Sequence, residues 1–112
     1  MDFRVKTFAA EASLRLGGVL EALGFTGPED VPSRDRYPLQ ITVRYRRSDA
    51  VVETRLTLGY MGEHDVHTSL LWIDDDCKVE VGTTTAHTGY QMRRGLDIHA
   101  RAVPALLQAG PP

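Results

Sequence analysis

Apolar residues in the first part of the chain recur at intervals of three and four, the spacing of an amphipathic helix over residues 5–23. Thr7 is expected to cap the start of this helix and Gly24 its end. The pair Gly17-Gly18 lies inside the stripe. Because glycine weakens a helix interior, we expect a bend or a break there, or a close backbone contact.

The same period returns after Gly89. One helical stripe carries Met92, Leu96, His99, Val103, Leu106 and Leu107. Pro104 removes a backbone donor, so we expect it to kink this helix or to force it to restart. Residues 110–112 are expected to form a frayed tail.

Between the helices the apolar residues alternate, which predicts strands. A tight turn at Ser48-Asp49 gives one register in which burial and charge agree. The pairs in this register are Tyr45 with Val52, Val43 with Thr54, Ile41 with Leu56, Arg44 with Glu53, and Thr42 with Arg55. This agreement predicts a β-hairpin.

A second hairpin is predicted from a strand over residues 67–73, a turn at residues 74–76, and a strand that begins near Lys78. In that last strand Val79, Val81, Thr83 and Thr85 are expected to share one face. Residues 26–38 contain three prolines and a glycine. We expect a loop there, because such a segment can continue neither a helix nor the hydrogen-bond ladder of a sheet.

These elements predict an α+β fold with the order α-β-β-β-β-α, in which a four-stranded antiparallel sheet of two hairpins lies between an N-terminal and a C-terminal helix. A chain of 112 residues lies within the usual size of one domain, so we expect residues 1–112 to form a single domain. One apolar face of the sheet needs a cover, and two amphipathic helices are at hand.

Composition narrows the classes of function. The longest apolar runs are only a few residues long, so no membrane span is expected. The net charge is −2, which disfavours non-specific nucleic-acid binding, although Arg34, Arg36, Arg44, Arg46 and Arg47 leave that hypothesis open. The single cysteine, Cys77, and the absence of an apolar leader fit the cytoplasm.

Histidine and acid side chains near the ends of the second hairpin suggest one enzymatic hypothesis, a metal-assisted or general acid-base hydrolase. The candidate set is His64, Asp65, His67 and His87. Some turn lengths would place His64 opposite His87, but His64 and His67 project to opposite faces of a regular strand. No specific metal-binding spacing supports the set, and this chemistry requires that the imidazoles converge on one pocket.

The other reactive groups form no recognised constellation. Asp74, Asp75 and Asp76 lack the frame of a calcium loop and suit a solvated turn. Their negative charge disfavours a thiolate at Cys77. His99 lies on an apolar stripe, which is typical of a core or interface histidine. No nucleotide-binding motif is present, so no cofactor is expected.

The charge along the chain is divided. Residues 34–55 carry six arginines and three acids, a balance of +3, and residues 61–80 carry six acids and one lysine, a balance of −5. Such a division can orient a partner, or it can reflect ion pairs between neighbouring strands. Either Leu70 and Trp72 or Leu71 and Ile73 must face away from the core.

The leading hypothesis is a non-enzymatic protein-binding or assembly module, such as an accessory subunit, an inhibitor or a homodimeric scaffold. Its partner, another protein or a second copy, would meet the outer sheet face or an edge strand. The expected contact residues are Arg44, Arg46 and Arg55, with Trp72 as an anchor.

Overall fold

The computed structural model describes residues 2–34 and 36–112. An N-terminal helical segment comprises α1 (Phe3–Ala12), a π-helical turn η1 (Ser13–Gly17) and α2 (Gly18–Ala22). Five strands follow, β1 (Thr26–Asp30), β2 (Leu39–Arg46), β3 (Ala50–Leu58), β4 (His64–Trp72) and β5 (Cys77–Thr85). The helix α3 (Gly89–Ala109) completes the order.

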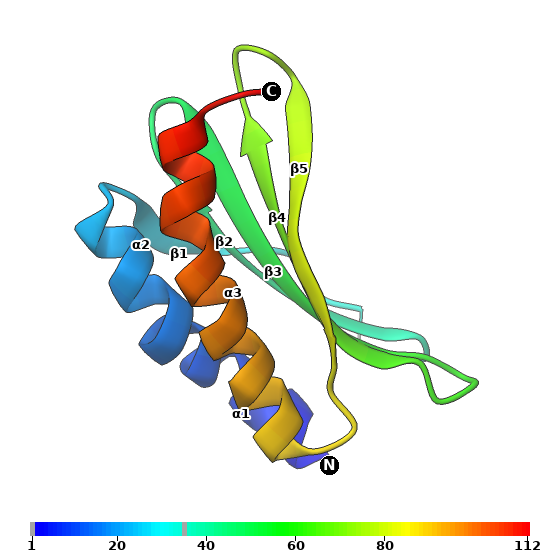
Figure 1. Cartoon of the computed structure of the whole chain (residues 1–112). Helices are drawn as coiled ribbons and strands as arrows, with labels where there is room; N and C mark the ends of the chain where they lie inside the picture. The colour runs from blue at the N-terminus through cyan, green and yellow to red at the C-terminus, as the bar shows by residue number, and fades with distance from the viewer. Residues whose placement is uncertain (1, 35) are drawn as a thin grey trace.

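The strands form one antiparallel sheet in the order β1-β2-β3-β4-β5, so each strand pairs with its neighbours in the chain. The helices lie together on one side of this twisted sheet (Figure 1). The predicted α+β class, the antiparallel sheet and the helix at each end are confirmed. The predicted number of strands is wrong, because the sheet has five strands and not four.

The additional strand, β1, lies in the segment that was predicted to be a loop. It pairs with β2 through Thr26 opposite Arg46 and Glu29 opposite Arg44, and the register shifts between these two pairs. Pro28 falls within the shift, at the edge of the sheet. An edge strand needs hydrogen bonds on one side only, so a proline that would break a central strand is tolerated there.

The first predicted hairpin is confirmed in register. Arg44 pairs with Glu53 and Tyr45 with Val52, and the other three predicted pairs also occur. Arg47 and Ala50 exchange backbone hydrogen bonds around the Ser48-Asp49 turn, at N–O distances of 2.8 and 3.4 Å. The alternation places Tyr45, Val52 and Leu56 in the core, where all three are at most 1% exposed.

The second hairpin contains an irregularity that the pattern did not predict. Thr68 pairs with Gly82 and Ser69 with Glu80, so Val81 is an extra residue in β5. Such a bulge reverses the alternation beyond it. Thr83 is therefore exposed, whereas Thr84 hydrogen-bonds to the buried His99. The expectation that Thr83 shares a face with Val79 is wrong for this reason.

The N-terminal helix begins two residues beyond Met1. Asp2, and not Thr7, caps it, since an Asp2 carboxylate oxygen accepts from the Arg4 N–H at 2.8 Å. The predicted irregularity at Gly17-Gly18 occurs as the π-helical turn that ends at Gly17. A Cβ atom on Gly17 would lie 2.5 Å from the Tyr45 hydroxyl oxygen, so the glycine permits a close contact between helix and sheet.

The core lies between the helices and one face of the sheet. Phe8, Leu16 and Leu20 contribute to it from the N-terminal segment, and Met92, Leu96 and Val103 from α3. The predicted stripe of α3 is thus the buried one, and α3 continues through Pro104 without restarting. No helix in the described part of the chain has the length and apolar character that crossing a lipid bilayer requires.

Candidate functional site

The face of the sheet that carries no helices is open (Figure 1). The register places its side chains in rows that cross the strands. One row is Arg46, Val51, Leu71 and Lys78, and the next is Arg44, Glu53, Ser69 and Glu80. The first row therefore has two apolar side chains between two cations.

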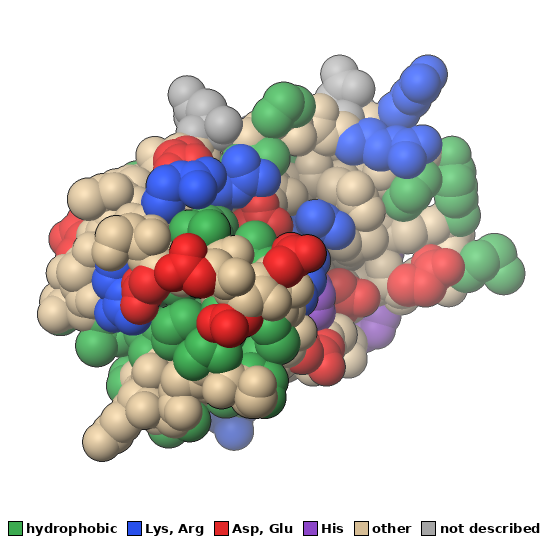
Figure 2. Space-filling view, turned by 90° about the horizontal axis from the view of Figure 1, so that it is seen from above, with side chains coloured by type: hydrophobic (Ala, Val, Ile, Leu, Met, Phe, Trp, Pro, Cys, Tyr) green, Lys and Arg blue, Asp and Glu red, His purple; other side chains and the backbone are tan. Residues whose placement is uncertain are grey.

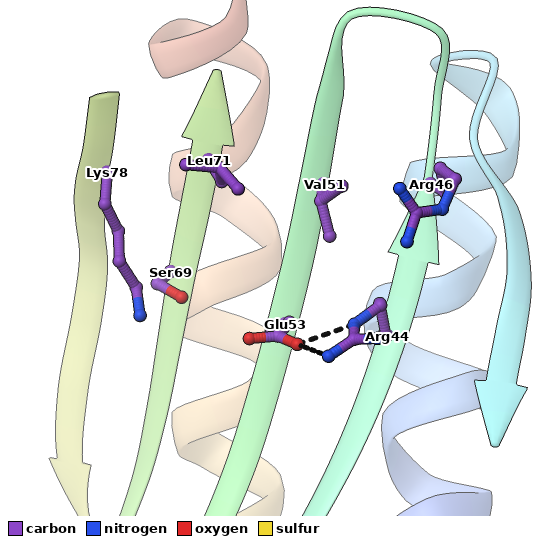
Figure 3. A pocket seen from close by; sticks show the side chains of 7 residues that line it. All are labelled: Arg44, Arg46, Val51, Glu53, Ser69, Leu71 and Lys78. Carbon is purple, nitrogen blue, oxygen red and sulfur yellow. Dashed lines mark hydrogen bonds and ion pairs between the residues drawn. The ribbon is translucent and has the colours of Figure 1, made fainter. Parts of the chain in front are cut away.

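These two rows surround a shallow hollow of about 230 Å³. Seven residues line it, namely Arg44, Arg46, Val51, Glu53, Ser69, Leu71 and Lys78 (Figure 3). Val51 and Leu71 lie between Arg46 and Lys78, on four adjacent strands. Val51 is 6% exposed although it faces away from the core and lies in the row between Arg46 and Leu71.

Two of the three predicted contact arginines are engaged in ion pairs. A guanidinium nitrogen of Arg44 lies 2.5 Å from a Glu53 carboxylate oxygen, and Nε of Arg46 lies 2.9 Å from a Glu29 carboxylate oxygen. The Arg46 hydrogen bond lowers the pKa of Glu29. The Arg44 pair is the one that the first hairpin predicted, but neither Glu53 nor Glu29 belongs to residues 61–80, so these two arginines do not pair with the acidic segment. Both are held in place on the open face.

Arg55 and Lys78 differ from them. Nε of Arg55 donates to the Thr42 hydroxyl at 3.2 Å, and neither Arg55 nor Lys78 forms an ion pair with a side chain of residues 2–29, 31–34 or 36–112. Arg55 lies in the third row, opposite His67. The open face thus presents two cations without carboxylate partners in the described chain.

Trp72 does not belong to this surface. It is 6% exposed and packs into the core on the helical face, together with Leu70. The alternation left two options for this strand, and the structure selects the one in which Leu71 faces outward. The expectation that Trp72 lies beside the three arginines is therefore wrong. Val51, Ser69, Leu71 and Lys78 were missed, although the predicted register already placed Val51 opposite Arg46.

Comparison of the chain with protein-family models, with curated proteins and with solved structures gives no match in any of the three. The functional argument therefore rests on the geometry of the chain itself.

The histidines proposed for metal or acid-base chemistry do not converge. His67 lies on the open face, with Nε2 3.4 Å from a Glu80 carboxylate oxygen. His64 lies on the other face, where Nδ1 is 3.0 Å from a guanidinium nitrogen of Arg4. Its ring is 5.3 Å from that of His87, but Ala86, not His87, is its backbone partner.

Asp65 pairs with Thr85 and lies on the same side of β4 as His67. No group of three histidine, cysteine or acidic side chains able to hold a metal ion occurs within the part of the chain that the structure describes. The arrangement therefore supplies no support for the hydrolase hypothesis.

The arginines considered for nucleic acid do not form one patch. Arg34 bridges to Gln40 near the start of β2, whereas Arg46 ends that strand. Arg47 is engaged elsewhere, with Nε 2.6 Å from an Asp49 oxygen and its guanidinium 4.9 Å from the centre of the Phe25 ring. A continuous basic track, which nucleic-acid backbones require, is not formed by these residues.

Proposed function

We propose that the chain is a non-enzymatic protein-binding module that meets its partner with the open face of its sheet. The observation that carries this proposal is the row of Val51 and Leu71 between Arg46 and Lys78, at a hollow of about 230 Å³. Protein interfaces combine a small apolar centre with a polar and charged rim. The row has this composition, on the one sheet face that the chain's own helices leave uncovered.

The charges of this face favour an acidic partner. Arg44 and Arg46 are already neutralised by Glu53 and Glu29, but Lys78 and Arg55 have no carboxylate partner in the described chain. A carboxylate brought to Lys78 would gain an ion pair that the isolated chain does not make. Acidic side chains that flank an apolar one therefore match the row best.

The partner on this surface is either another protein or a second copy of the chain, and we place both in the cytoplasm on the basis of the lone thiol of Cys77.

The two lysines of the chain provide a matched pair of variants. Lys78 lies in the row, whereas Lys6 is an exposed residue of α1 on the helical side of the sheet.

The test is site-specific photo-crosslinking of the full chain in cells that express it. A photoreactive phenylalanine analogue at Leu71 is expected to give a discrete adduct, and one at the exposed helical position Arg101 is not. Lys78→Glu should abolish the adduct and Lys6→Glu should leave it. An adduct of twice the chain mass would identify a second copy. The same pattern of adducts from both positions, or none at Leu71, would contradict the proposal.

A further inference from the structure

The sheet has two edges, and the chain protects them differently. At one edge β1 is five residues long, shifts its register, and contains Pro28, which has no N–H. At the other edge β5 is nine residues long and contains no proline. Short strands and prolines are devices that prevent another strand from adding to a free edge. The edge that remains able to pair is therefore β5.

The outer side of β5 carries no other strand. Among residues 2–34 and 36–112, the backbone groups of β5 form backbone hydrogen bonds with β4 alone. Apart from β4, the element that packs against β5 is α3. Figure 3 shows Lys78 on β5 at the margin of the sheet, with no strand beyond it. The N–H and C=O groups that point away from β4 are thus available to another strand.

The charges of β5 are placed symmetrically about one residue. Lys78 and Glu80 flank Val79, and both are exposed on the open face. Lys78 forms no ion pair among the described side chains. Glu80 uses one carboxylate oxygen, Oε1, which accepts from the Thr83 hydroxyl and lies 3.4 Å from Nε2 of His67. Its second oxygen is free to accept a further cation.

This symmetry suits a second copy of the same strand. A two-fold axis at the edge makes two copies of β5 antiparallel and gives every contact twice. With the axis at Val79, Lys78 of each copy lies opposite Glu80 of the other. On the helical side Val79 then meets its own copy, and Cys77 meets Val81. These three side chains are half-buried in the single chain, so the pairing covers apolar surface that remains exposed.

The neighbouring registers are disfavoured by charge. An axis at Lys78 or at Glu80 would place two like charges opposite each other. An axis at Cys77 would bring Glu80 opposite Asp74 of the other copy. Figure 2, seen from the end of the molecule at which the β4–β5 turn lies, shows that acidic side chains gather there. With the axis at Val79, this turn meets uncharged residues of the other copy instead.

We propose that β5 pairs antiparallel with β5 of a second copy about a two-fold axis at Val79, so that two five-stranded sheets become one continuous sheet. The helices of both copies then lie on the same side, and the two open faces form one surface. The pairing uses the edge and leaves the open face uncovered, so it does not depend on the function proposed for that face.

Charge variants next to the axis test the pairing in the full chain. Lys78→Glu and Glu80→Lys each place like charges opposite each other twice, and each should raise the dissociation constant of the dimer about tenfold or more in sedimentation equilibrium. Lys6→Glu makes the same change of net charge as Lys78→Glu at an exposed helical position, and should leave the constant unchanged. Glu80 does not line the hollow of the open face, so Glu80→Lys reports on the edge alone.

The two charge variants should also pair with each other. In a mixture of the Lys78→Glu chain and the Glu80→Lys chain, the two acids of one copy lie opposite the two lysines of the other. The mixture should therefore recover a dimer that neither variant forms well alone. A loss of folding in either variant could not produce this recovery.

The register is tested with single thiols in a Cys77→Ser background. Val79→Cys should form a disulfide between copies on oxidation, because side chains directly opposite have Cβ atoms about 5 Å apart. Thr83→Cys should not, because its two copies lie roughly 27 Å apart along the strands. The proposal is overturned by a native chain that is monomeric at about 1 mM, by a dimer that both charge variants leave intact, by a mixture that stays monomeric, or by equal disulfide yields at the two positions.

Discussion

Nδ1 of His99 on α3 lies 2.7 Å from the hydroxyl oxygen of Thr68 on β4. The other ring nitrogen lies 2.8 Å from the Thr84 hydroxyl, and Thr68 in turn donates to Thr54 at 2.9 Å. A chain of hydrogen bonds thus joins α3 to three strands inside the core. Gly82 provides the space, since a Cβ atom there would lie 2.6 Å from the imidazole.

This burial makes stability depend on pH. Desolvation, with a smaller contribution from His67 that Glu80 opposes, lowers the pKa of His99 from 6.5 to about 4. Between these values the unfolded chain binds a proton that the folded chain does not. The free energy of unfolding should therefore fall as the pH is lowered through this window, by at most about 3 kcal/mol.

Urea unfolding at several pH values between 4 and 7 measures this effect. His99→Gln should flatten the dependence, and the matched change at the exposed His87 should not. An unaltered slope in His99→Gln would show that another group causes the loss.

The adjacent glycines of the N-terminal segment predict opposite responses to alanine. A Cβ atom on Gly18 would meet no heavy atom within 4 Å, so Gly18→Ala should stabilise the chain by about 0.5–1 kcal/mol through helix propensity. Gly17→Ala places a methyl group against the fully buried Tyr45, and should lower the free energy of unfolding of the protein by about 1–3 kcal/mol. Thermal unfolding distinguishes the two.

The contact itself is tested by combining Gly17→Ala with Tyr45→Phe, which removes the hydroxyl that the methyl group meets. The double variant should recover part of the loss seen in Gly17→Ala. Simple addition of the two single effects would place the cause elsewhere.

Arg4 connects the start of α1 to the residue that follows β5 by hydrogen bonds. It is 9% exposed and donates to the Ala86 carbonyl at 2.6 Å, while its hydrogen bonds lower the pKa of Asp2 to about 2. Arg4→Gln leaves these acceptors without their donor and should cost about 2–3 kcal/mol. Arg101→Gln, an exposed change of the same kind, should cost less than about 0.5 kcal/mol in denaturant unfolding. Equal losses would contradict the anchoring role.

The pair of Arg44 and Glu53 is suited to a charge exchange. Arg44→Glu places two carboxylates opposite each other on β2 and β3, and Glu53→Arg places two guanidinium groups there. Each single variant should lose stability and the exchanged pair should recover it, with a coupling of about 0.5–1 kcal/mol for these partly exposed side chains. A coupling near zero in the double-mutant cycle would mean that the pair contributes nothing.

The register of the first hairpin was predictable because two independent patterns agreed on it. A shift of one residue would bury Arg44 and expose Tyr45, and a shift of two would separate Arg44 from Glu53, so burial and charge together favour the observed register. The strand β1 was not predictable in the same way. Pro28 and Gly27 lower the strand propensity, and only the position at the edge of the sheet makes them acceptable.

The candidate site was predicted in part for a related reason. The alternation along β4 predicted that either Leu70 and Trp72 or Leu71 and Ile73 face outward, but it did not decide which pair does so. Beyond Val81 the bulge reversed the faces. Gly82, which follows Val81, is a residue type that often marks a bulge in a strand, but it does not by itself fix where the alternation reverses. Arg44, Arg46 and Arg55 were placed on the open face because their hairpin is regular.

The order of the strands has a consequence for synthesis on the ribosome. Each strand of the sheet pairs with the one made just before it, so pairing can proceed as the nascent chain lengthens. The half of the apolar face formed by β4 and β5, however, is covered by α3, the last element to emerge. Until residues 89–109 leave the exit tunnel, Val66, Leu70 and their apolar neighbours are exposed to water. We expect chaperones that recognise exposed apolar side chains to bind the nascent chain during this interval.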